Sequence, residues 1–166
     1  GAEGLLVEYA LAMREDGRSL DETEARIRAT LPDAHLLLIP RTLENLVKNG
    51  RAPKLAGQLT QMLNIRLAVS PEWKSGEIKA IKKGRGAKRI VANTMADCLA
   101  FLTEHPGSSV RVLTTGAAEE QELVNQALAG QDYVDAGTGP IGCTIATHVG
   151  VDAIAISYCP RYQPTR

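Results

Sequence analysis

The fold is decided by residues 65–81, which read IRLAVSPEWKSGEIKAI. Two short runs, 65–69 and 77–81, flank a middle segment that holds Ser70-Pro71 and Ser75-Gly76, pairs that favour turns. This pattern predicts a β-hairpin in which the two runs are paired strands. A hairpin joins its strands antiparallel, so a sheet that contains this one is not all-parallel.

Helical and strand patterns alternate on both sides of the hairpin. Apolar residues at three- and four-residue steps, with their capping signals, predict helices over 5–13, 20–31, 42–49, 53–63, 91–102 and 123–128. Short apolar runs predict further strands at 36–39, 110–113, 133–134, 141–147 and 153–158. Because strands interleave with helices, we predict an α/β (α+β) fold with helices packed on a mixed sheet.

The composition is typical of one globular domain over residues 1–166. Hydrophobic residues make up 44% and charged residues 23%, which excludes disordered and low-complexity classes. The 19 basic residues balance the 19 acidic ones, so no overall field attracts nucleic acid or an anionic membrane. Aromatic residues are only 4% of the chain, which argues against a base-stacking surface.

The cysteines and the hydropathy indicate a cytoplasmic protein. Cys98, Cys143 and Cys159 are odd in number, lack CxxC spacing and stand among apolar neighbours, as reduced and buried thiols do. No apolar run approaches the roughly 18 residues of a membrane span. We therefore expect no stable membrane insertion.

Residues 137–142 (GTGPIG) match the GxGxxG pattern of dinucleotide sites. Such a site needs a helix after the glycines, because the helix amides and dipole bind the pyrophosphate. The segment 141–147 is short and rich in β-branched residues, which argues against a helix there. We interpret the glycines as a turn between strands and expect no cofactor.

Positive charges concentrate between residues 79 and 89. A solvated edge is the ordinary role of such a cluster, whereas a functional one would dock an acidic protein surface or a phosphate. A nucleic-acid patch would need interleaved aromatic residues, which are missing. The cluster consists of Lys79, Lys82, Lys83, Arg85, Lys88 and Arg89.

Arg51 and His148 are candidate polar ligands that stand next to turns. Arg51 follows Asn49-Gly50 at a predicted helix end, and His148 lies where a predicted strand runs into a turn. Each alone has an ordinary structural explanation. No recurrent zinc spacing includes His148, and Ser157 lacks the glycines of a nucleophile elbow, so we predict neither a metal site nor a hydrolase.

Four segments, taken in chain order, resemble the second domain of the DegV family of bacterial fatty-acid-binding proteins. They are Thr42–Arg51 (TLENLVKNGR), Leu63–Arg66 (LNIR), the basic stretch Lys82–Lys88 and Ile141–Gly150. The resemblance covers nearly the whole chain. The chain departs from the family pattern at Asn49, Ala52 and Leu67, where the family usually has Gly, Ile and Pro, and in residues 148–152, where it usually has His-Thr-Gly-Pro-Gly.

The resemblance implies a mixed sheet of about six strands in a two-domain protein that holds one fatty acid between its domains. Family members present this acid to a separate ATP-dependent fatty acid kinase, which phosphorylates the carboxylate for phospholipid metabolism. The chain resembles the second domain alone, without the N-terminal α/β domain whose Ser and Thr grip the carboxylate. It therefore resembles a lipid-binding protein that is not itself an enzyme.

Physical chemistry indicates which residues would serve such a site. Each buried CH₂ contributes about 0.8 kcal/mol, so an apolar lining supplies the affinity for the acyl chain. The carboxylate needs donors at the mouth, because an unpaired charge is costly in an apolar slot. The candidates are Arg51 and His148 for the head group, Met62, Leu63, Ile65 and Ile145 for the acyl-chain lining, and Lys82, Lys83 and Arg85 for docking the kinase.

Two other interpretations stay open. The first is a domain of a dihydroxyacetone-kinase-like small-molecule kinase, whose fold resembles the DegV fold and which would use His148 to bind a ketone covalently. The second is a plain interaction module that uses the basic edge. Such a module predicts salt-dependent partner binding and no lipid.

Overall fold

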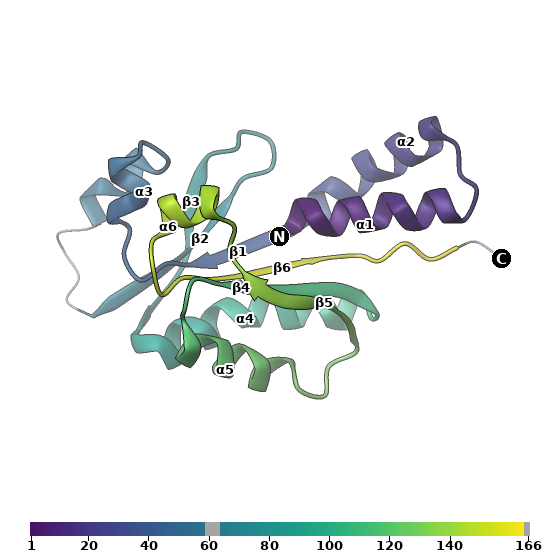
Figure 1. The fold of residues 1–166 in the computed structure, drawn as a ribbon. Coiled ribbons are helices and arrows are strands. Elements are labelled where there is room, and N and C mark those ends of the chain that lie inside the picture. Colours follow the sequence, from purple (N-terminus) through teal and green to yellow (C-terminus); the bar gives the residue numbers. More distant parts are fainter. Residues whose placement is uncertain (59–63, 165–166) are drawn as a thin grey trace.

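The computed structural model describes residues 1–58 and 64–164 and contains a six-stranded sheet in the order β3-β2-β1-β6-β4-β5. Only β4 and β5 run parallel among the paired strands, which confirms the predicted mixed sheet. The last strand of the chain thus lies in the middle of the sheet (Figure 1). The strands are β1 (His35–Ile39), β2 (Ile65–Pro71), β3 (Ile78–Arg85), β4 (Ser108–Thr114), β5 (Tyr133–Pro140) and β6 (Ile154–Cys159).

The predicted hairpin is formed by β2 and β3, with Pro71 opposite Ile78 at its closed end and Ile65 opposite Arg85 at its open end. Both strands extend beyond the predicted runs: β2 continues through Ser70 and Pro71, and β3 continues through residues 82–85. A bulge between Ala68 and Val69 shifts the register within the hairpin.

Helices cover both faces of the sheet (Figure 1). The helices are α1 (Ala2–Glu15), α2 (Leu20–Thr30), α3 (Glu44–Lys48), α4 (Gly86–Glu104), α5 (Ala118–Leu128) and α6 (Cys143–Val149), with 3₁₀ helices at Leu31–Asp33 and Pro53–Gln58. Pro53–Gln58 is a 3₁₀ helix and not the start of the α-helix predicted over 53–63, and the rest of that predicted helix lies outside the described residues. Figure 1 shows α4 and α5 on one face, and α1, α3 and α6 on the other.

Two apolar clusters lie on opposite faces of the sheet. Ile90 of α4, Val124 of α5 and Ile156 of β6 belong to one cluster. Leu46 of α3 and Val149 of α6 belong to the other, together with side chains from β1, β2 and β6. Because β6 contributes alternate residues to the two clusters, it is buried along its whole length.

Helix α6 corrects the expectation that residues 141–147 are not helical. Gly142, in an extended conformation, begins the helix, and its carbonyl accepts hydrogen bonds from the amides of Ile145 and Ala146. Val149 is only 3% exposed and packs in the cluster that contains Leu46. This burial outweighs the weak helix propensity of the β-branched residues. His148 therefore lies in the last turn of a helix and not at the end of a strand.

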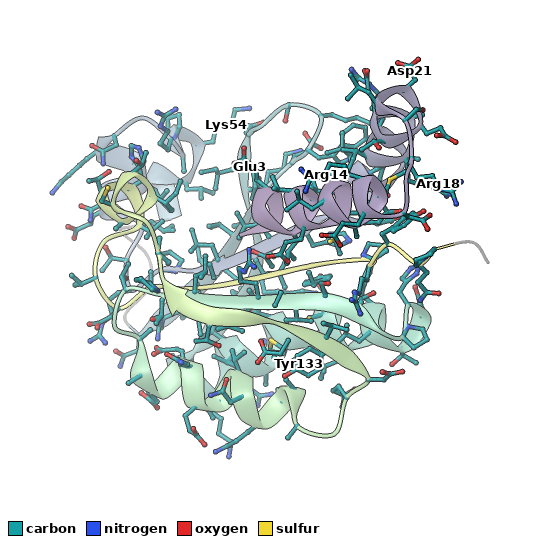
Figure 2. All side chains as sticks on the ribbon, turned by 45° about the vertical axis from the view of Figure 1, so that its right-hand side comes forward. Glu3, Arg14, Arg18, Asp21, Lys54 and Tyr133 are labelled. Atoms are coloured by element: carbon teal, nitrogen blue, oxygen red, sulfur yellow. The ribbon has the colours of Figure 1, made fainter. Side chains whose placement is uncertain are left out.

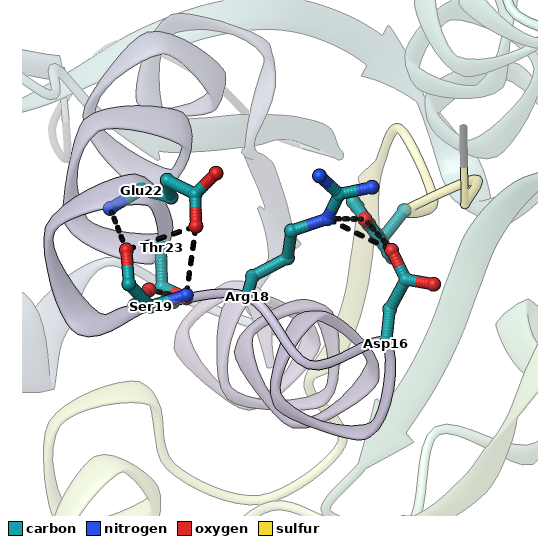
Figure 3. Close-up of polar contacts among 6 residues, drawn as sticks. Asp16, Arg18, Ser19, Glu22 and Thr23 are labelled. Carbon is teal, nitrogen blue, oxygen red and sulfur yellow. Dashed lines mark hydrogen bonds and ion pairs between the residues drawn. The ribbon is translucent and has the colours of Figure 1, made fainter. Parts of the chain in front are cut away.

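The α1–α2 connection is held by two polar networks (Figure 3). The Ser19 hydroxyl accepts from the Glu22 amide at 3.3 Å, and the Glu22 carboxylate accepts from the Ser19 amide at 2.8 Å, so the predicted capping box is present. The Tyr162 hydroxyl donates to Asp16 at 2.6 Å, and Arg18 donates to both groups. The hydrogen bond from Tyr162 and the nearby Arg18 lower the pKa of Asp16.

Candidate functional site

Helices α3 and α6 lie next to each other at one end of the molecule (Figure 1). Of the two candidate head-group residues, Arg51 follows the end of α3 and His148 lies within α6. The side-chain amide of Asn49, at the end of α3, donates to the Thr147 carbonyl of α6 at 3.1 Å. The two helices also share the apolar cluster beneath them. Segments almost a hundred residues apart are therefore brought together on one face of the sheet.

The backbone of Arg51 is held by the C-terminus of α3. Gly50 has φ of +67°, and its amide donates to the Val47 carbonyl at 3.0 Å. The Arg51 amide reaches back to the Leu46 carbonyl at 2.8 Å. This pair of bonds forms a Schellman motif, in which Asn49-Gly50 ends the helix as the sequence predicted. The Arg51 side chain is exposed.

His148 lies in the last turn of α6 and is half-buried. Its Nδ1 atom is buried and has no hydrogen-bond partner among the residues that the structure describes. A buried ring nitrogen without a partner is costly. Arg51 and His148 thus belong to adjoining segments, and their shared role in binding stays a prediction.

The candidate acyl-chain residues are distributed around this end of the sheet. Ile145 on α6 is 52% exposed, so it is a surface side chain and not part of either core cluster. Ile65 is half-buried at the start of β2. Met62 and Leu63 lie outside the described residues.

A polar groove of about 560 Å³ opens at the same end of the sheet, below α3. Ile65 and Arg85 line it, but Arg51 and His148 are not among its described lining residues. The charged residues of the lining are Arg41, Arg66 and Arg85 against Glu44, Glu119 and Glu120. The formal charges of these lining residues therefore cancel.

One buried ion pair in the groove wall has no signal in the sequence. Arg66 of β2 contacts Glu120 of α5, and both side chains are largely buried. Burial, and then the positive charge of Arg41, lower the pKa of Arg66. The apolar runs predicted β2 and α5 separately, but no pattern indicated that two residues so distant in the chain would pair.

The candidate docking residues lie on β3, an edge strand of the sheet. Lys82 is engaged, since its Nζ lies 2.8 Å from the Asp97 carboxylate of α4. Lys83 and Arg85 are exposed and form no ion pair within residues 1–58 and 64–164. Lys54 extends from the second 3₁₀ helix toward this hairpin (Figure 2), where its Nζ lies 2.6 Å from Glu77. The basic cluster is thus only partly available to a partner.

The cysteines differ in their surroundings. Cys98 and Cys159 are buried, as the sequence predicted, and burial raises the pKa of Cys98 to about 12. Cys143 is exposed at the start of α6, which corrects the expectation of three buried thiols. Within the described part of the chain, no three His, Cys, Asp or Glu side chains are placed to hold a metal ion. Nor does any helix there have the length and apolar character needed to cross a membrane.

Comparisons with known proteins match the chain to one protein family. The model of that family, described as "Uncharacterised protein, DegV family COG1307", matches residues 1–161. The DegV domain-containing protein CA_C0701 of Clostridium acetobutylicum is 29% identical over 161 residues, which are 96% of this chain and 56% of that protein. YteA of Lactococcus lactis is 31% identical over 158 residues, 93% of this chain and 53% of that protein.

The fold is also similar to solved structures. A DegV family protein from Thermus thermophilus, described as fatty-acid binding, superposes with a TM-score of 0.85 at 22% identity, covering 96% of this chain and 57% of that one. The chain spans about half the length of the curated relatives it matches.

Proposed function

The chain belongs to the DegV family, and from this premise we propose that it is a fatty-acid-binding domain that presents its ligand to a separate fatty acid kinase. The observation that carries the proposal is the match of the family model to residues 1–161. Solved proteins with the same fold include several described as fatty-acid binding.

The head group is assigned to Arg51 and His148. A guanidinium donates two parallel hydrogen bonds to a carboxylate, and an imidazole donates a further one. Support comes from the packing of α3 on α6, which places the two residues on adjoining segments. These donors offset the cost of taking the carboxylate out of water.

The acyl chain is assigned to the apolar surface around α6 and the start of β2. Ile145 is exposed there and Ile65 is half-buried, while Met62 and Leu63 are assigned to the same lining from sequence alone. At about 0.8 kcal/mol for each buried CH₂, an acyl chain gains on the order of 10 kcal/mol before its ordering cost is subtracted. The acyl chain thus supplies most of the binding affinity, and the carboxylate fixes the orientation of the bound fatty acid.

The kinase is proposed to dock on the edge of β3 through Lys83 and Arg85, with Lys82 contributing less because of its ion pair with Asp97. In this arrangement the partner carries out the phosphoryl transfer, and the chain is a substrate-presenting protein that needs no cofactor. Since the kinase uses ATP, we place the protein in the cytoplasm.

Native mass spectrometry of the full gene product, purified from cells without added lipid, tests the proposal. We expect a mass increment equal to one fatty acid, which disappears after delipidation and returns on adding oleate. A protein that carries no fatty acid and takes up none contradicts the proposal. Phosphoryl transfer to a triose without any added kinase would instead identify a dihydroxyacetone-kinase-like enzyme.

A further inference from the structure

Two asparagines on one side of α3 contact α6. Asn45 and Asn49 are four residues apart, so they lie on the same face of the helix, one turn from each other. The Asn49 amide donates to the Thr147 carbonyl at 3.1 Å. A Cβ atom added to Gly150 would lie 2.7 Å from Asn45 Nδ2, so the Asn45 side chain lies directly against the Gly150 backbone.

The carbonyl that Asn49 contacts is one that the helix itself leaves unpaired. The last carbonyls of an α-helix have no partner within the helix. At the end of α6 the Gly150 amide donates to the Ala146 carbonyl at 2.8 Å. The following carbonyl, that of Thr147, is one of those that the helix leaves without a partner. Asn49 therefore caps the C-terminus of α6 from a neighbouring element. A cap of this kind matters most in a helix of only seven residues, which has few internal hydrogen bonds.

The cap joins the two segments that carry the assigned head-group residues. Asn49 stands two positions before Arg51, whose amide is bound to the Leu46 carbonyl of the same helix end. Thr147 directly precedes His148. Arg51 and His148 are therefore connected by the C-terminal end of α3, the hydrogen bond from Asn49 to Thr147, and the peptide unit between Thr147 and His148.

Gly150 lies where the end of α6 meets α3. Its φ of +77° is in the left-handed region that favours glycine, and any side chain there would displace Asn45. The Asn49 hydrogen bond and the Gly150 contact are thus two points at which α3 meets the end of α6. We propose that Asn49 is a positioning residue, which sets the His148 imidazole relative to the Arg51 guanidinium by capping α6. The importance of that geometry for a ligand rests on the proposed function.

NMR spectra of the 166-residue chain test the positioning role in the absence of any ligand. Asn49→Ala removes the donor without adding a charge, and Lys48→Ala alters the adjoining exposed position of the same helix as the matched control. We expect Asn49→Ala to shift the NMR resonances of the His148 imidazole and of the Thr147 carbonyl, while Lys48→Ala leaves them unchanged. Identical His148 resonances in Asn49→Ala and in the unaltered chain would overturn the inference.

Fatty-acid affinity separates this inference from the proposed function. In the full gene product, we expect Asn49→Ala to weaken oleate binding about two- to tenfold, the size of one lost hydrogen bond, with the thermal midpoint lowered by no more than a few degrees. Equal affinity of Asn49→Ala and the unaltered protein would contradict the positioning role. Failure of the unaltered protein to bind oleate would refute the proposed function, and the NMR comparison would still decide the role of Asn49.

Discussion

Arg66 of β2 and Glu120 of α5 form an ion pair inside the protein, although they stand 54 positions apart in the chain. Their side chains are 12% and 6% exposed, so neither charge is fully solvated. A second Arg66 nitrogen lies 3.5 Å from the Pro40 carbonyl. The pair thus joins strand β2 to helix α5 in the lining of the groove.

Removing one partner of this pair leaves a buried charge without compensation. We expect Glu120→Ala to lower the free energy of unfolding by about 3–5 kcal/mol. The double variant Arg66→Met, Glu120→Leu removes both charges and should recover most of that loss. Urea denaturation with a constant m-value measures both. A double variant as unstable as Glu120→Ala would show that shape, and not charge, is what the pair provides.

The pH dependence of stability should include a contribution from His35, which packs against both the Phe101 and the Tyr158 ring, with centroids 5.3 and 4.8 Å away. Burial lowers the pKa of His35 from its ordinary 6.5, an effect that nearby Asp33 and Asp97 oppose and His105 reinforces. Between that lowered pKa and 6.5 the unfolded chain binds a proton that the folded chain does not.

The free energy of unfolding should therefore fall as the pH falls through this window, and the His35 contribution should be flat above it. Urea unfolding of the chain between pH 5 and 8 measures the slope. We expect His35→Gln, which cannot titrate, to show a shallower slope than the unaltered chain. Equal slopes in the two proteins would assign the effect to other groups.

The head-group assignment predicts the behaviour of two single variants. Arg51→Ala and His148→Ala should each slow acyl-phosphate formation by the kinase about tenfold or more, since each removes a charge-assisted hydrogen bond to the carboxylate. Both should leave the circular dichroism spectrum unchanged, and Lys48→Ala should turn over normally. Unchanged turnover in both head-group variants would remove these residues from the site.

The docking assignment predicts a loss of kinase affinity that depends on salt. Arg85→Glu should weaken the complex more than Lys82→Ala, because Lys82 is already paired with Asp97. Calorimetric titration at low and at high salt measures the effect, and the difference between variants should shrink as salt screens the charges. Arg28→Glu on α2 is the control. If it weakens the complex as much as Arg85→Glu, the edge of β3 is not the interface.

Local signals in the sequence predicted the elements that depend on neighbouring residues. The hairpin of residues 65–81 is marked by its turn residues, and the start of α2 by the Ser19 capping box. The end of α3 is marked by Asn49-Gly50, which adopts the expected motif. In each case the structure is determined by hydrogen bonds within a few residues of the signal, so a short window of sequence was sufficient.

Features that depend on distant partners had no such signal. Helix α6 forms because Gly142 begins it and Val149 is buried beside α3, and its β-branched composition alone pointed to a strand. The pairing of Arg66 with Glu120 and the cap from Asn49 to Thr147 both join residues from separate elements. The candidate residues on α6 were therefore identified by type and motif, while their helical setting required the three-dimensional structure.

The central position of β6 has a consequence for synthesis on the ribosome. β6 hydrogen-bonds to β1 on one side and to β4 on the other, so β3-β2-β1 and β4-β5 form two partial sheets that share no strand pairing until residues 154–159 emerge. The nascent chain therefore exposes the open edge of β1, and later also that of β4, until β6 is synthesised, and unpaired strand edges are prone to aggregation. A premature stop before residue 154 would leave these two pieces unjoined, and quality-control proteases would be expected to degrade the product.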